Sequence, residues 1–125
     1  MARAVVAAAA LLAVGLWAWP EIRHAIRRSE LLGEAPPGRL PVPVEGVEPE
    51  EVASTFGDPR AGGARWHEGL DIFASRRTPI QRATRGIVVR RGTNPLGGRT
   101  VTILGPGGWR LYYAHLQQWA GHVEG

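Results

Sequence analysis

The chain has 125 residues, which fits one domain of ordinary size, and its composition of 44% apolar and 21% charged residues excludes wholesale disorder. It has no cysteine, so disulfides, cysteine-ligated metals and a thiol nucleophile are excluded, and any metal must be held by His, Asp or Glu. The net charge of +4 suits an anionic partner such as a membrane surface, a cell-wall polymer or a nucleic acid.

An unbroken apolar run occupies residues 4–19 and is followed by Pro20. As a helix it would rise about 24 Å, slightly less than the ~30 Å hydrocarbon core of a bilayer. Trp17 and Trp19 stand where interfacial aromatic residues are common, and no good cleavage site for a signal peptidase follows. We therefore expect residues 1–20 to be a membrane anchor, with a cleaved signal sequence and a buried core helix as the alternatives.

Residues 21–51 connect this segment to the rest of the chain. Their first part, residues 21–32, is compatible with a short helix whose arginines could reach lipid phosphates. The proline-rich part, residues 33–43, cannot hold a helix, because each proline fixes its own φ and favours extended backbone before it. We expect a juxtamembrane helix followed by a semi-rigid linker, and we interpret His24 as a solvated residue.

From about residue 52 onward, short β-like runs alternate with glycine-rich turns. Five runs have the length and composition of strands: 70–73, 80–83, 86–91, 100–104 and 110–114. The Gly-Pro-Gly-Gly sequence at 105–108 predicts a hairpin turn, residues 93–98 predict another loop, and no helix longer than two turns is expected after Ser54. The predicted fold class is mainly β, an antiparallel β-sheet domain preceded by an N-terminal apolar helix.

A candidate metal site stands in the stretch WHEGLDI, where His67 and Asp71 flank Gly69. Four residues of extended backbone span about 13 Å, too far for two ligands that each lie about 2.0–2.2 Å from one metal. The two side chains can share a metal only if the chain bends near Gly69, the residue that bends at least cost. Taken alone, the pattern fits either a metal site or an ordinary surface turn.

Other aromatic, histidine and arginine residues have structural interpretations. His115 follows two tyrosines at the end of the last predicted strand, where a half-buried, hydrogen-bonded histidine would be ordinary. Trp66, Trp109 and Trp119 are interpreted as core or groove-wall residues, with stacking on sugar or peptide as the alternative. No nucleic-acid motif accompanies the arginines, so we expect a solvated basic surface and no nucleic-acid partner.

Several short motifs, taken together and in order, resemble the M23 (LytM/lysostaphin-type) peptidase domain. They are FGDPR at 56–60, HEGLDI at 67–72, TPIQRA at 78–83, GIVV at 86–89 and YAHL at 113–116. The resemblance covers roughly residues 52–125. It implies a bacterial zinc endopeptidase that cuts the peptide cross-links of peptidoglycan in cell-wall remodelling, on a mostly antiparallel β fold.

The resemblance also implies roles for single residues. His67 and Asp71 match the family's first two zinc ligands, and His115 matches the histidine that orients the attacking water or stabilises the transition state. The implied cofactor is Zn²⁺ and the implied partner is a peptidoglycan peptide. The domain is expected outside the cytoplasm in the cell envelope, attached to the membrane through the N-terminal helix, or secreted if that segment is cleaved.

One motif of the family is missing from this sequence. The family pattern continues to a His-x-His motif that supplies the third zinc ligand and the catalytic base, and the sequence contains no His-x-His. We therefore expect a C-terminally incomplete domain that is inactive as this 125-residue chain, with His122 and Glu124 as solvated residues rather than substitutes. The alternatives are a catalytically inactive M23-like module that binds cell wall or regulates other hydrolases, and an unrelated membrane-anchored β module.

Overall fold

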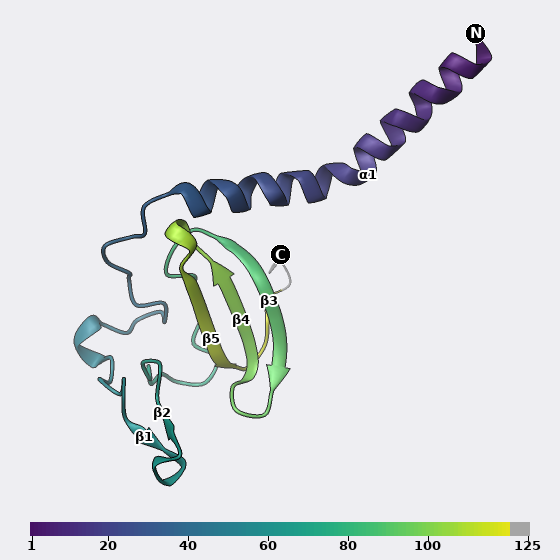
Figure 1. The fold of residues 1–125 in the computed structure, drawn as a ribbon. Helices are drawn as coiled ribbons and strands as arrows, with labels where there is room; N and C mark the ends of the chain where they lie inside the picture. Colours follow the sequence, from purple (N-terminus) through teal and green to yellow (C-terminus); the bar gives the residue numbers. More distant parts are fainter. Residues whose placement is uncertain (121–125) are drawn as a thin grey trace.

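A computed structural model describes residues 1–120 (Figure 1). Within them the regular elements are α1 (Ala2–Gly33), β1 (Pro59–Arg60), β2 (Arg65–Trp66), β3 (Ile87–Asn94), β4 (Gly98–Leu104) and β5 (Arg110–Leu116). Short 3₁₀ turns lie at Pro49–Glu51, Ala61–Gly63 and Pro106–Gly108. The strands form two antiparallel sheets, β1–β2 and β3–β4–β5, so the predicted order of an apolar helix followed by antiparallel β structure is confirmed.

The expected anchor and the short helix expected after it form a single helix, because α1 continues through Pro20 to Gly33. A proline inside a helix removes one backbone hydrogen bond and crowds the preceding turn, so it bends a helix whose two flanks are both helix-forming. Figure 1 shows such a bend in α1. The helix is long and apolar enough to cross a membrane, and none of its most apolar window is buried. This finding suits a membrane anchor or a signal sequence and argues against a buried core helix.

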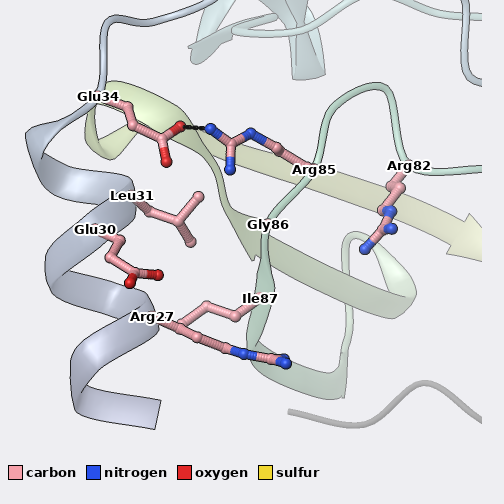
Figure 2. A pocket seen from close by; sticks show the side chains of 8 residues that line it. All are labelled: Arg27, Glu30, Leu31, Glu34, Arg82, Arg85, Gly86 and Ile87. Carbon is pink, nitrogen blue, oxygen red and sulfur yellow. Dashed lines mark hydrogen bonds and ion pairs between the residues drawn. The ribbon is translucent and has the colours of Figure 1, made fainter. Parts of the chain in front are cut away.

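The last turns of α1 pack beside the three-stranded sheet, where Leu31 is buried and Arg85 forms an ion pair with Glu34 (Figure 2). The proline-rich segment is non-helical as predicted, but it does not hold the helix away from the sheet, because Pro36 lies against Gly107. A pocket of about 250 Å³ remains between the helix and the loop before β3. It is lined by Arg27, Glu30, Leu31, Glu34, Arg82, Arg85, Gly86 and Ile87.

The three-stranded sheet confirms the last three predicted strands, each a little longer than expected. The predicted turn at 105–108 joins β4 to β5, with Gly107 and Gly108 at φ values of 69° and 76°, which glycine adopts at no steric cost. Among the described residues, three of the six buried apolar side chains come from β4: Val101, Ile103 and Leu104. β4 is the central strand, so its backbone groups are hydrogen-bonded on both edges.

Two predicted strands are wrong. Residues 70–73 and 80–83 make only one isolated bridge each, at Asp71 and at Ile80. Proline has no N–H for a ladder, so Pro79 and the prolines in the partner segment stop the second pairing after one step. The β1–β2 hairpin was not predicted, because two-residue strands are too short to show an alternating pattern.

Candidate functional site

The two predicted metal ligands lie at the end of the β1–β2 hairpin. His67 directly follows β2, and its N–H donates to the Asp58 carbonyl at 2.8 Å while its own carbonyl accepts the Gly57 N–H at 2.7 Å. These bonds extend the hairpin by one pair of residues. The chain then bends at Gly69, which is the bend that a shared metal would require, and Asp71 bridges back to the segment that precedes the hairpin. The bend brings together two side chains that extended backbone would hold about 13 Å apart.

The side chains of His67 and Asp71 converge, with 3.5 Å between the imidazole Nε2 and the carboxylate Oδ1. This distance is long for a hydrogen bond, but it is close to the separation of about 3.3 Å between two donors on one tetrahedral zinc. Gly69 leaves the imidazole uncovered, since an added Cβ would lie 3.4 Å from Nε2. The two donor atoms therefore fit two adjacent positions of a tetrahedral metal site.

Arg60 and Thr55 contact the other sides of these two residues. Arg60 Nη2 donates to Asp71 Oδ2 at 2.5 Å and lies 3.0 Å from His67 Nδ1. The Thr55 carbonyl lies 3.0 Å from His67 Nδ1, and the Thr55 hydroxyl accepts the Asp71 N–H at 3.1 Å. Neither residue was predicted to have a role in the site. Arg60 is part of the FGDPR motif. No sequence pattern around Thr55 indicates a role, because it reaches the site only through pairing between distant segments of the chain.

The surroundings of Asp71 favour its ionised form. Partial desolvation raises the pKa of the Asp71 carboxyl, but the hydrogen bond from Arg60 and the charges of His67 and Arg60, together with the Thr55 hydroxyl, outweigh it. The net result is a pKa below the usual value for an aspartate. An ionised carboxylate is the form that binds a metal.

His115 lies on a β-bulge near the end of β5. The two residue steps from Arg99 to Val101 on β4 lie opposite three steps, from Leu116 to Tyr113, on β5, so β5 has one extra residue there. His115 takes a φ of 57°, a left-handed conformation uncommon outside glycine, and its N–H donates to the Gly97 carbonyl at 2.6 Å. The residue is exposed rather than half-buried. Bulges of this kind often re-aim a side chain beside an active site.

The described residues supply two convergent donors. Within residues 1–120, no group of three His, Asp or Glu side chains is placed to hold a metal ion. In the same range, the His115 side chain makes no hydrogen bond or ion pair with His67 or Asp71. His122 and Glu124, considered above as replacement ligands, lie outside the described residues.

Two of the three singled-out tryptophans are not core residues. Trp66 and Trp109 are 65% and 45% exposed, which leaves the groove wall or stacking as their possible roles. Trp119 is half-buried, and the guanidinium groups of Arg91 and Arg99 lie over its ring, 5.4 and 5.8 Å from its centre. These cation–π contacts fasten the segment after β5 to the sheet.

Comparison with known proteins places these residues in a family. Residues 65–124, which include His67, Asp71 and His115, match the model of Peptidase family M23. Over 72 residues the chain is 41% identical to the L-Ala--D-Glu endopeptidase of Bacillus subtilis (strain 168), an alignment covering 57% of this chain and 22% of that protein. The chain thus spans about a fifth of that relative's length. No solved structure matches it. The resemblance to Peptidase family M23 that the motifs predicted is thus confirmed over residues 65–124.

Proposed function

We propose that the M23 domain of this chain serves a zinc-dependent endopeptidase that cuts peptide cross-links of peptidoglycan. The family match and the activity named for the Bacillus relative support a cell-wall peptide as the substrate. The observation that carries the proposal is the convergence of His67 Nε2 and Asp71 Oδ1 at 3.5 Å, at a bend where Gly69 leaves the imidazole open. This geometry favours a shared metal over a direct hydrogen bond.

Each residue of the site has a proposed task. His67 would hold zinc through Nε2 and Asp71 through Oδ1, with Arg60 keeping that carboxylate ionised. A bound zinc polarises a peptide carbonyl and lowers the pKa of a water molecule. His115, exposed on its bulge, would donate a hydrogen bond to the oxygen on which negative charge develops. Its strained backbone supports a functional role, because such strain concentrates at active sites.

The proposed location is the cell envelope, where a peptidoglycan substrate would be found. The apolar part of α1 is unburied and long enough to cross a membrane. It would either anchor the domain or direct its export before being cleaved. The net charge of +4 suits attraction to anionic wall polymers.

Zinc binding tests the ligand pair. The chain, purified in detergent, would be titrated with zinc by calorimetry beside His67→Ala, Asp71→Ala and a control, His24→Ala, that removes an exposed histidine from α1. We expect weaker binding than at a complete three-ligand site, with loss in the first two variants and no change in the control. Equal zinc affinity in all four proteins would contradict the assignment.

Hydrolysis tests the reaction. Release of soluble peptides from purified peptidoglycan would be measured for the chain alone and for the chain extended by an M23-type His-x-His segment. We expect zinc-dependent cleavage only by the extended chain, and slower cleavage with zinc still bound in its His115→Ala variant. Peptidoglycan binding without cleavage by either protein would favour the inactive binding module. Chelator-sensitive cleavage by the unextended chain would instead point to His122 or Glu124 as a ligand.

A further inference from the structure

Thr55 joins the two proposed metal ligands to one another. Its carbonyl oxygen lies 3.0 Å from Nδ1 of the His67 ring, and its hydroxyl accepts the N–H of Asp71 at 3.1 Å. The side chain of one ligand and the backbone of the other are therefore held by a single residue. Thr55 is 12 residues from His67 and 16 from Asp71 in sequence. The connection therefore forms only when these segments pair in the folded state.

The contacts at His67 Nδ1 exclude one another. Thr55 O and Arg60 Nη2 both lie 3.0 Å from this nitrogen. A neutral imidazole has one N–H and one lone pair, so Nδ1 either donates to the Thr55 carbonyl or accepts from Arg60. Only the first arrangement leaves the lone pair on Nε2, which is the atom that faces Asp71.

We propose that Thr55 is a positioning residue for the metal site: its carbonyl selects the His67 ring form with Nε2 free, and its hydroxyl fixes the position of Asp71. This inference rests on the proposed zinc-dependent function. A metal-bound histidine commonly donates its other N–H to a backbone carbonyl or carboxylate, and loss of such outer partners typically costs 10–100-fold in metal affinity. Arg60 completes the arrangement by occupying Asp71 Oδ2, which leaves Oδ1 toward the metal.

The test compares Thr55→Val, which removes the hydroxyl but keeps the branched shape, with Thr55→Ser, which keeps the hydroxyl. A control, Thr78→Val, removes a hydroxyl that bonds the Ser75 carbonyl away from the site. Zinc affinity of the folded chain would be measured by competition with a chromogenic chelator. We expect about a tenfold or greater loss in Thr55→Val, with near wild-type affinity in Thr55→Ser and Thr78→Val. A purely structural role would lower the melting temperature without changing the zinc affinity of folded protein.

Two further readouts need no metal. Nitrogen-resolved NMR of the metal-free chain at pH 8 should place the His67 ring hydrogen on Nδ1, and the Asp71 amide should exchange faster in Thr55→Val than in Thr55→Ser. A ring hydrogen on Nε2, or wild-type zinc affinity in Thr55→Val, would overturn the inference while leaving the zinc function intact. Zinc binding that His67→Ala does not weaken would instead overturn the proposed function, and this inference with it.

Discussion

Replacement of Gly86 by alanine should destabilise the three-stranded sheet. Gly86 immediately precedes β3, where that strand approaches the end of β4. A Cβ built at this position would lie 2.4 Å from the Leu104 carbonyl oxygen and 2.7 Å from Ile103 Cγ2. The first contact is with backbone, so no side-chain rotation can relieve it. The two strands would have to separate by about 0.6 Å to restore a contact of 3.0 Å.

The expected cost can be compared with that of a matched glycine-to-alanine substitution within β3. Overpacking of this kind costs about 1–3 kcal/mol in the free energy of unfolding. Gly92→Ala is the control, because a Cβ there has no neighbour within 4 Å and its φ is not positive. It should be neutral, or stabilising by about 0.4–1 kcal/mol through reduced entropy of the unfolded chain. At about 4–8 °C per kcal/mol for a domain of this size, the two variants should melt at least about 4 °C apart.

Thermal unfolding of both variants, followed by circular dichroism in the same detergent, checks this expectation. Gly86→Ala should melt below the wild-type chain, and Gly92→Ala at or above it. Coincident melting curves for the two variants would refute the argument, because they would show that β3 and β4 can separate at this point without cost.

Further substitutions address pH dependence, strain and location. The pKa of Asp71 is depressed in the folded state. Its ionised form therefore stabilises the fold at neutral pH, and this contribution is lost as the pH falls through the folded-state pKa. Arg60→Gln should lower the free energy of unfolding at pH 7 and flatten its decline below about pH 4, as measured by urea unfolding. Burial raises the pKa of Tyr113 despite the N–H that Ala83 donates to its oxygen. Its stabilising contribution is therefore lost above about pH 10; Tyr113→Phe should remove that alkaline loss and cost about 1–3 kcal/mol at pH 7, whereas an unchanged alkaline melting profile would contradict the assignment. His115→Gly should melt higher than His115→Ala, because glycine relieves a left-handed backbone strain of about 1–3 kcal/mol; equal melting temperatures would argue against strain. The full chain should sediment with membranes in cell fractionation, and a soluble cytoplasmic pool would exclude the anchor.

The parts of the fold that were predicted correctly depend on local sequence. The strands β3, β4 and β5 are predicted by their runs of β-prone residues. The Gly-Pro-Gly-Gly turn between the last two is predicted because its glycines can adopt the positive φ values that the turn requires. Continuation of α1 through Pro20 was missed, because the helical preference of both flanks outweighs one lost hydrogen bond. The β1–β2 hairpin was missed because two-residue strands carry no periodic signal.

In the candidate site too, some residues could be selected from local sequence and others could not. His67 and Asp71 could be selected as candidates from their residue types, with a bend at Gly69 as the condition for their meeting, and the structure contains that bend. Thr55 could not be selected, since its contacts arise from pairing between segments more than ten residues apart. The bulge that exposes His115 depends on the register between β4 and β5, and register is set by the whole sheet rather than by any short motif.

Because α1 continues as one helix from the apolar run to the sheet, it limits how far the sheet can lie from a membrane that holds the apolar run. The 14 residues from Pro20 to Gly33 stay helical and end against the sheet, where Leu31 is buried. At 1.5 Å per residue they make a strut of about 21 Å. A domain attached through a helix of this length can reach fewer positions than one attached through a flexible linker. With α1 in a membrane, the sheet would be held within about 21 Å of the lipid surface, so a substrate of the proposed kind would have to lie in that layer.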